Sequence, residues 1–172
     1  MTALLMRLFR KWLLFKDAEY YSFMSRICKE ADLSDYFLEM MIKRCTFSKE
    51  FDEEELNLLH CAFEHFFHPL MYSYRKLEYL ELNRRETNHK SEIIQLKEKL
   101  RTKIRSEFSR FDANICKKLL SLTTNIESKL YLLKLRADFS MYCCETCSKL
   151  ERSNFITTTF NVIQLIFLYL AL

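Results

Sequence analysis

The sequence of 172 residues contains no glycine and a single proline, Pro69. Strand-rich folds depend on tight turns, and most such turns need glycine or proline. Phosphate-binding loops, dinucleotide-binding turns and glycine-flanked nucleophile motifs also need glycine and are excluded. Hydrophobic residues make up 49% of the chain and charged residues 29%, which fits neither a disordered chain nor a polytopic membrane protein. We therefore predict an all-α fold.

The chain is organised around residues 52–82, whose apolar residues recur every three or four positions, as on the buried face of a helix. A second stripe on this helix has the spacing to line a groove and consists of Glu64, His68, Met71 and Arg75. Four further helices are predicted at 17–31, 35–47, 91 to about 120, and 126 to about 152. Together these helices form one predicted domain over residues 17–150.

The two ends of the chain differ from this domain. Residues 1–16 form a basic amphipathic extension without acids, which fits a mitochondrial presequence or a membrane-surface helix. A packed extra helix or an unselected extension fits equally well. Residues 151–172 form an apolar tail. The tail is long enough to span a bilayer, and docking on the domain, or a terminus never selected as part of the fold, are the alternatives. Without residues 1–16 the chain has a net charge near zero, so we predict no nucleic-acid partner.

Cysteines and histidines give no sign of a metal site. The seven cysteines are irregularly spaced, which is typical of a reduced intracellular protein, and Cys144 and Cys147 form a CxxC pair without a second pair. His60 and Cys61 point in different directions from His65 on a helix, and no set of carboxylates or cysteines completes a metal site. We therefore predict no metal and no cofactor. No nucleophile–base–acid set appears, so we also predict no enzymatic activity.

Two segments, residues 53–67 (EEELNLLHCAFEHFF) and residues 126–145 (IESKLYLLKLRADFSMYCCE), resemble helices of the 14-3-3 family of phosphopeptide-binding adaptors. With supporting matches at 30–41 and 96–108, the resemblance covers about residues 17–148. It implies the antiparallel helices of the N-terminal half of the family's horseshoe, followed here by an apolar C-terminal helix. It also implies a non-catalytic, cytoplasmic adaptor of the signalling class with protein partners.

The resemblance places three phosphate-binding positions of the family on residues without positive charge. These are Glu64, Met71 and Met141. The groove positions that keep the family's residue type are Arg75, Lys134, Asp138, Tyr142 and Glu145. Each charge-assisted hydrogen bond to a phosphate contributes roughly 1.5–3 kcal/mol, so three missing cations remove on the order of 5–9 kcal/mol. We expect the binding of phosphoserine and phosphothreonine peptides to be weakened or lost.

The resemblance also implies a dimer interface in the first helices. Its small or apolar positions are Ile27, Ala31, Ser73, Leu77 and Leu80. The two cross-dimer salt bridges of the family become Leu33 with Glu107, and Tyr36 with Lys103. Exposed ion pairs contribute little and apolar burial contributes more, so we still expect association. Homodimers and heterodimers with an intact 14-3-3 protein both stay open.

Two alternatives to the adaptor are kept. One is a membrane-associated helical protein anchored by residues 155–172, because no charged residue follows Arg152. The other is a degenerate family member without selected ligand binding.

Overall fold

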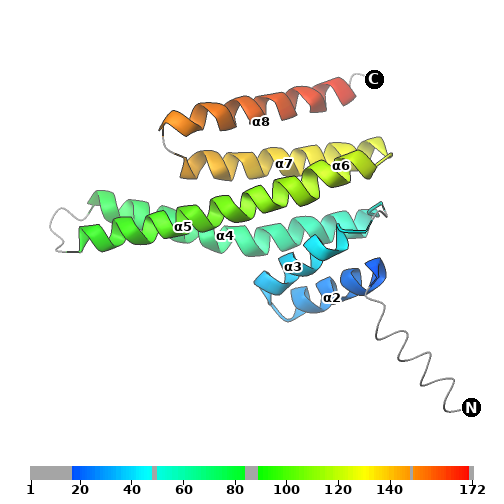
Figure 1. The fold of residues 1–172 in the computed structure, drawn as a ribbon, viewed down its shortest axis with the longest axis horizontal. Helices are drawn as coiled ribbons and strands as arrows, with labels where there is room; N and C mark the ends of the chain where they lie inside the picture. Colours follow the sequence, from blue (N-terminus) through cyan, green and yellow to red (C-terminus); the bar gives the residue numbers. More distant parts are fainter. Residues whose placement is uncertain (1–16, 48–49, 84–88, 148, 171–172) are drawn as a thin grey trace, which may run out of the picture.

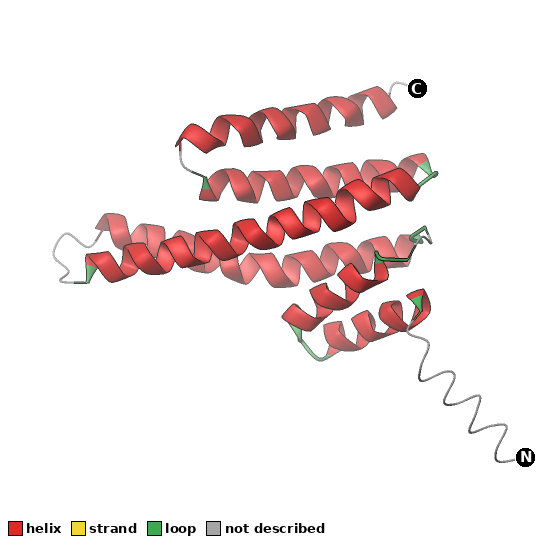
Figure 2. Cartoon of the chain, viewed as in Figure 1, coloured by secondary structure: helices red, strands yellow, loops and turns green. Residues whose placement is uncertain are grey.

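The structure is a computed structural model that describes residues 17–47, 50–83, 89–147 and 149–170. The described residues contain helices and no strand, which confirms the all-α prediction (Figures 1 and 2). The elements are α2 (Ala18–Glu30), α3 (Ser34–Arg44), α4 (Glu53–Asn83), α5 (Lys90–Phe111), the π-helical stretch η1 (Asp112–Lys117), α6 (Lys118–Leu122), α7 (Ile126–Thr146) and α8 (Lys149–Leu170). Residues 1–16 lie outside the described residues, so their alternatives are not tested.

The core forms where α4, α5 and α7 meet, and it is rich in phenylalanine. Phe63 and Phe67 of α4 are buried, with ring centres 4.5 Å apart, and the ring centre of Phe67 lies 5.7 Å from that of Phe139 on α7. Fully burying one such side chain contributes about 1.5–3 kcal/mol. The helix α4 continues through Pro69, so the long helix predicted over residues 52–82 is present as one element.

A buried ion pair ties α3 to α4. Arg44 is fully buried, and its Nε and Nη2 donate to Oε1 and Oε2 of Glu55 at 2.7 and 2.6 Å. The hydroxyl of Ser22 on α2 also donates to Glu55. The guanidinium of Arg44 stacks over the ring of Phe51, 4.3 Å from its centre. One carboxylate thus holds the first three described helices together.

Two predicted helices differ in detail from the observed ones. The helix predicted from 91 to about 120 contains the π-helical stretch η1, at whose start Asp112 accepts a hydrogen bond from Nε of Arg136 at 2.6 Å. The helix predicted to run to about 152 ends at Thr146, because Cys147 has an extended backbone (φ −81°, ψ 148°) and α8 then begins at Lys149. The periodicity of apolar residues did not reveal this break, because α7 and α8 are both apolar on the sides that face each other.

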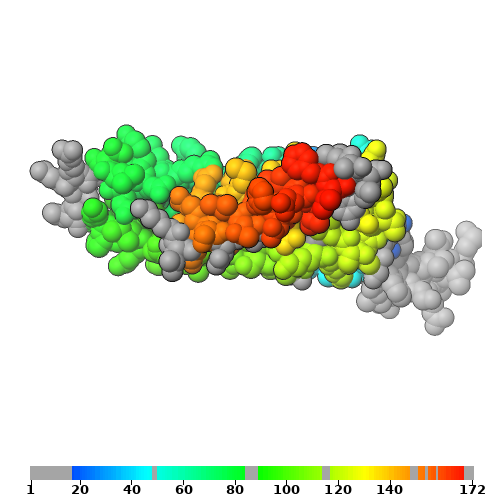
Figure 3. Space-filling view, turned by 90° about the horizontal axis from the view of Figure 1, so that it is seen from above, coloured from blue at the N-terminus to red at the C-terminus, as the bar shows by residue number. Residues whose placement is uncertain are grey.

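The apolar tail is a helix docked on α7. Val162 is buried against Leu133 and Ala137, and the ring centres of Phe155 and Phe108 lie 6.0 Å apart. Figure 3 shows α8 as an exposed layer along one face of the molecule. Within the described ranges, no helix has both the length and the apolar character needed to cross a membrane. The described part of the tail thus packs on α7, as the docking alternative expects.

Candidate ligand groove

Three polar pairs bridge α4 and α7 along one face, and we call them the α4–α7 ladder. They are His60 with Tyr131, His68 with Tyr142, and Arg75 with Glu145, at 3.0, 2.8 and 2.8 Å. The three α4 residues are spaced by about two helical turns each, so they share a face. This is the face on which the sequence predicted a groove.

Arg75 is already occupied. Its Nε and Nη2 donate to the two carboxylate oxygens of Glu145, each at 2.8 Å, in the bidentate geometry that makes such pairs strong. Hydrogen bonding to Glu145 raises the pKa of Arg75 above its usual value. A phosphate that approached Arg75 would have to displace a carboxylate of the same protein.

The three substituted family positions lie at different depths. Glu64 is half-buried and its carboxylate lies 3.4 Å from Nε2 of His60. Met141 is 61% exposed on α7. Met71, by contrast, is only 1% exposed and belongs to the hydrophobic core. Two of the three positions therefore lie at the surface of this face, and the third packs beneath it.

The remaining groove residues leave the surface slightly acidic. Lys134 is exposed and Asp138 is half-buried on the same helix. Burial raises the pKa of Tyr142, and the nearby carboxylate of Glu64 raises it further. The predicted groove positions thus carry three carboxylates, of Glu64, Asp138 and Glu145, against the two cations Arg75 and Lys134. A doubly charged phosphate gains little net attraction from such a surface.

Sequence reasoning named most of these residues but missed how they pair. The hydrogen bonds of Tyr131 to His60 and Asn57, at 3.0 and 3.2 Å, were not anticipated. The spacing of polar residues along α4 was the available signal. Their partners on α7 lie about 70 residues away in the sequence, so spacing within one helix does not identify them.

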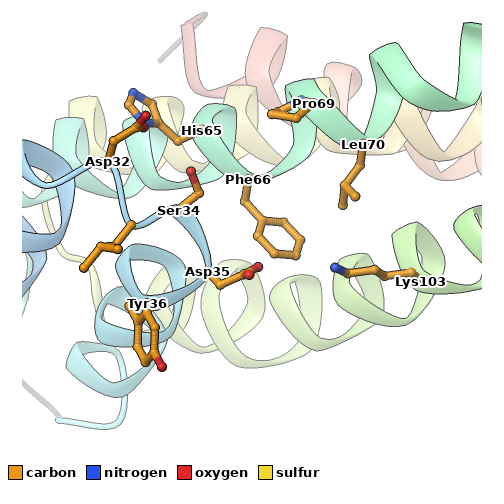
Figure 4. Close-up of a pocket in the computed structure, with 10 residues that line it drawn as sticks. Asp32, Ser34, Asp35, Tyr36, His65, Phe66, Pro69, Leu70 and Lys103 are labelled. Atoms are coloured by element: carbon orange, nitrogen blue, oxygen red, sulfur yellow. The ribbon is translucent and has the colours of Figure 1, made fainter.

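The predicted dimer positions all lie at the surface. Ile27, Ala31, Leu33, Tyr36, Ser73 and Lys103 are exposed, and Leu77, Leu80 and Glu107 are half-buried. A cavity of about 440 Å³ at this surface is lined by Tyr36 of α3, Phe66 of α4 and Lys103 of α5, among others. Figure 4 shows these three side chains. Leu33, at the start of α3, also lines the cavity. The cavity brings together three of the positions that the family resemblance assigned to cross-dimer contacts.

Two buried thiols, of Cys45 and Cys143, are poorly suited to chemistry. Burial raises the pKa of Cys45 to about 12 and also raises the pKa of Cys143. Sγ of Cys147 accepts a hydrogen bond from Arg105 at 3.3 Å. In the part of the chain that the structure describes, no group of three or more His, Cys, Asp or Glu side chains is arranged to hold a metal ion.

Comparison with known proteins agrees with the resemblance seen in the sequence. A family model described as 14-3-3 protein matches residues 24–162. The chain is similar to the 14-3-3-like proteins G-BOX factor 14 kappa and lambda of Arabidopsis thaliana, at 26% and 27% identity, over 78% of this chain and 56% of each relative. It is 28% identical to 14-3-3 protein 10 of Solanum lycopersicum, over 73% of this chain and 51% of that protein. The chain thus spans about half the length of the curated relatives it matches.

Proposed function

This chain belongs to the 14-3-3 family, and we propose that it acts as a non-catalytic protein-binding module. In this proposal the chain dimerises through its first helices and has lost phosphate-dependent peptide recognition. Family membership supports the protein-binding role. The loss of phosphate recognition is carried by one observation, the Arg75–Glu145 pair within a surface that has more carboxylates than cations. The expected cytoplasmic location stays a prediction.

Dimerisation is supported by apolar exposure around the predicted interface. Ile27, Leu33 and Tyr36 are exposed large side chains, as are Tyr72 and Tyr79 of α4. Exposed apolar residues that gather on one side of a monomer mark interaction surfaces. The ion pairs of the family are replaced here, so burial of apolar area is the main contribution that we expect. Homodimers and heterodimers with an intact 14-3-3 protein would both use this surface.

The proposal on phosphate is tested by calorimetric titration with matched peptides that differ only in one phosphoserine. We expect the phosphorylated and plain peptides to bind with the same affinity within a factor of about three, a difference below 1 kcal/mol. Binding of the phosphorylated peptide at least tenfold tighter would refute the proposal.

The proposal on dimerisation is tested by sedimentation of the wild type and of Ile27→Asp/Leu77→Asp. We expect the wild type to dimerise and the variant to be monomeric, because a carboxylate in an apolar interface is left unpaired. Ile126→Asp is the matched control, since Ile126 is an exposed apolar residue at the start of α7. A monomeric wild type, or an Ile126→Asp variant that dissociates equally, would contradict the proposed interface.

A further inference from the structure

The outer side of α8 carries an apolar stripe that the described part of the chain leaves exposed. It consists of Ile156, Phe160, Ile163 and Phe167, which are 37–67% exposed. At about 100° per residue, these four side chains lie within about 60° of one another around the helix axis. Val162, which is buried against α7, lies on a different side of α8. The stripe is therefore not the surface that attaches α8 to the domain, and we call it the α8 stripe.

The order of residues in the α8 stripe suits an antiparallel copy of the same helix. The intervals of four, three and four positions are those of the apolar seam between two packed helices, and they read the same from either end. In an antiparallel pair, Ile156 of each copy therefore lies opposite Phe167 of the other, and Phe160 opposite Ile163. Each layer then joins one ring to one smaller branched side chain, the combination that fills the space between helices. Parallel copies would instead oppose like to like.

The α8 stripe is uncharged, which favours a second copy over a charged partner. No charged residue follows Arg152 in the sequence, so two copies of the stripe bring no like charges together. Glu151, before the stripe, is bound to Arg105 of α5 at 2.9 Å. A basic or acidic segment would find no charge to pair with along the stripe, whereas a second copy offers an apolar surface of matching length.

The exposed area of the α8 stripe fits a weak contact between two copies. A large aromatic side chain can bury about 150–250 Å², so at the observed exposures the four residues offer on the order of 400 Å². Two copies would together bury roughly 800 Å², less than the approximately 1,200 Å² at which stable interfaces begin. Contacts of this size are transient, and we expect a dissociation constant on the order of 100 μM.

We propose that the chain self-associates through α8, with the α8 stripes of two copies packed antiparallel about a two-fold axis. Figure 3 shows α8 as an outer layer of the molecule, open to such a copy. In Figure 1, α8 and α2 lie on opposite sides of the molecule, so this contact leaves the predicted first-helix dimer surface free.

The α8 contact goes beyond the proposed function and does not rest on it. Where the first-helix dimer also forms, each dimer carries one α8 stripe on either outer side. The two contacts together then join dimers into tetramers and longer chains. Concentration separates the two contacts, because the α8 contact is the weaker one and forms only in concentrated protein.

Sedimentation equilibrium of the full chain tests the α8 contact. Between about 5 and 500 μM, we expect the average mass of the wild type to rise by at least about 1.5-fold. Phe160→Glu/Ile163→Glu should keep its low-concentration mass throughout, because a carboxylate in the contact is left without a partner. Leu165→Glu/Leu168→Glu is the matched control, since both leucines are exposed on other sides of α8, and it should associate like the wild type.

A variant with opposite charges tests the orientation of the two helices. Phe160→Glu/Ile163→Lys carries as many charges as Phe160→Glu/Ile163→Glu, but in an antiparallel pair each glutamate faces a lysine of the other copy. We expect it to associate about tenfold more tightly than the double glutamate variant, and we expect this gain to fade in about 1 M salt. Parallel helices would oppose like charges, so equal association of the two variants would overturn the antiparallel pairing.

A wild-type mass that stays constant over this range would overturn the α8 contact, whatever else then covers the α8 stripe. Equal loss of association in Leu165→Glu/Leu168→Glu would also overturn it. These outcomes are separate from the test of the first-helix dimer. Association that persists in Phe160→Glu/Ile163→Glu but is lost in Ile27→Asp/Leu77→Asp would support the first-helix dimer and overturn the α8 contact.

Discussion

Arg75 on α4 and Glu145 on α7 form a bidentate ion pair, with both nitrogen–oxygen distances at 2.8 Å. The pair neutralises the arginine of the groove, so we expect Glu145→Gln to release its charge and to tighten the binding of phosphoserine by about tenfold. Titration with phosphoserine, followed by NMR, measures the affinity of each variant. Glu98→Gln, which breaks the Glu98–Arg101 pair on α5, is the control. The prediction is wrong if the two variants bind phosphoserine equally.

Restoring two surface cations should restore part of the phosphate recognition. In Glu64→Lys/Met141→Arg, both new cations lie at the groove surface, and we expect a phosphorylated peptide to bind at least tenfold tighter than its plain counterpart. Glu78→Lys makes the same charge change as Glu64→Lys alone, at an exposed site of α4, and should leave the ratio at about one. A ratio near one in the double variant would mean that the groove fails for a reason other than charge.

The fold was largely predictable because helical periodicity is a local property. Apolar spacing located α4 within a residue or two of its ends, and the absence of glycine excluded strand-rich folds. The family resemblance then named the groove. Positions such as Glu64 and Tyr142 were found because the resemblance assigns them residue by residue from the matching segments.

The rest depended on contacts between distant segments. Met71 shares the helical spacing of Glu64, yet it is buried, because the depth of a position depends on what packs against it. The partner of Arg44 is 11 residues away across a helix boundary, and no single-helix pattern identifies it. The break at Cys147 is a change in backbone direction within an apolar run. None of these features changes the periodicity from which the prediction was made.

The buried ion pair of Arg44 and Glu55 should be a large contributor to stability. Removing one partner leaves the other charged and buried, so Arg44→Met should lower the free energy of unfolding by about 3–5 kcal/mol. Arg26→Met is the matched control, since Arg26 pairs with the exposed Glu54 at 2.8 Å and should cost no more than about 1 kcal/mol. Urea denaturation gives both values. Equal losses in the two variants would contradict the assigned role of burial.

The carboxylate of Glu55 should also make the stability of the protein depend on pH in the acid range. Burial alone would raise the pKa of Glu55, but hydrogen bonds from Arg44 and Ser22 and the charge of Arg44 bring it below the usual 4.5. A lowered folded-state pKa gives stability that is present above pH 4.5 and is lost as the pH falls through the folded-state value. Urea midpoints should therefore fall more steeply below pH 4.5 in the wild type and in Glu54→Gln than in Glu55→Gln. Parallel curves for all three proteins would contradict this.

Val162 should decide whether α8 stays attached. It is the described α8 residue buried against Leu133 and Ala137, and a carboxylate placed there would be desolvated without a partner. We expect Val162→Asp to speed hydrogen exchange in residues 155–168 by about a hundredfold, equivalent to about 2.7 kcal/mol. The core around α4 does not include Val162, so its exchange should change little. Asn161→Asp, at the neighbouring exposed position, should behave like the wild type. If Val162→Asp exchanges like Asn161→Asp, α8 is held by contacts other than this cluster.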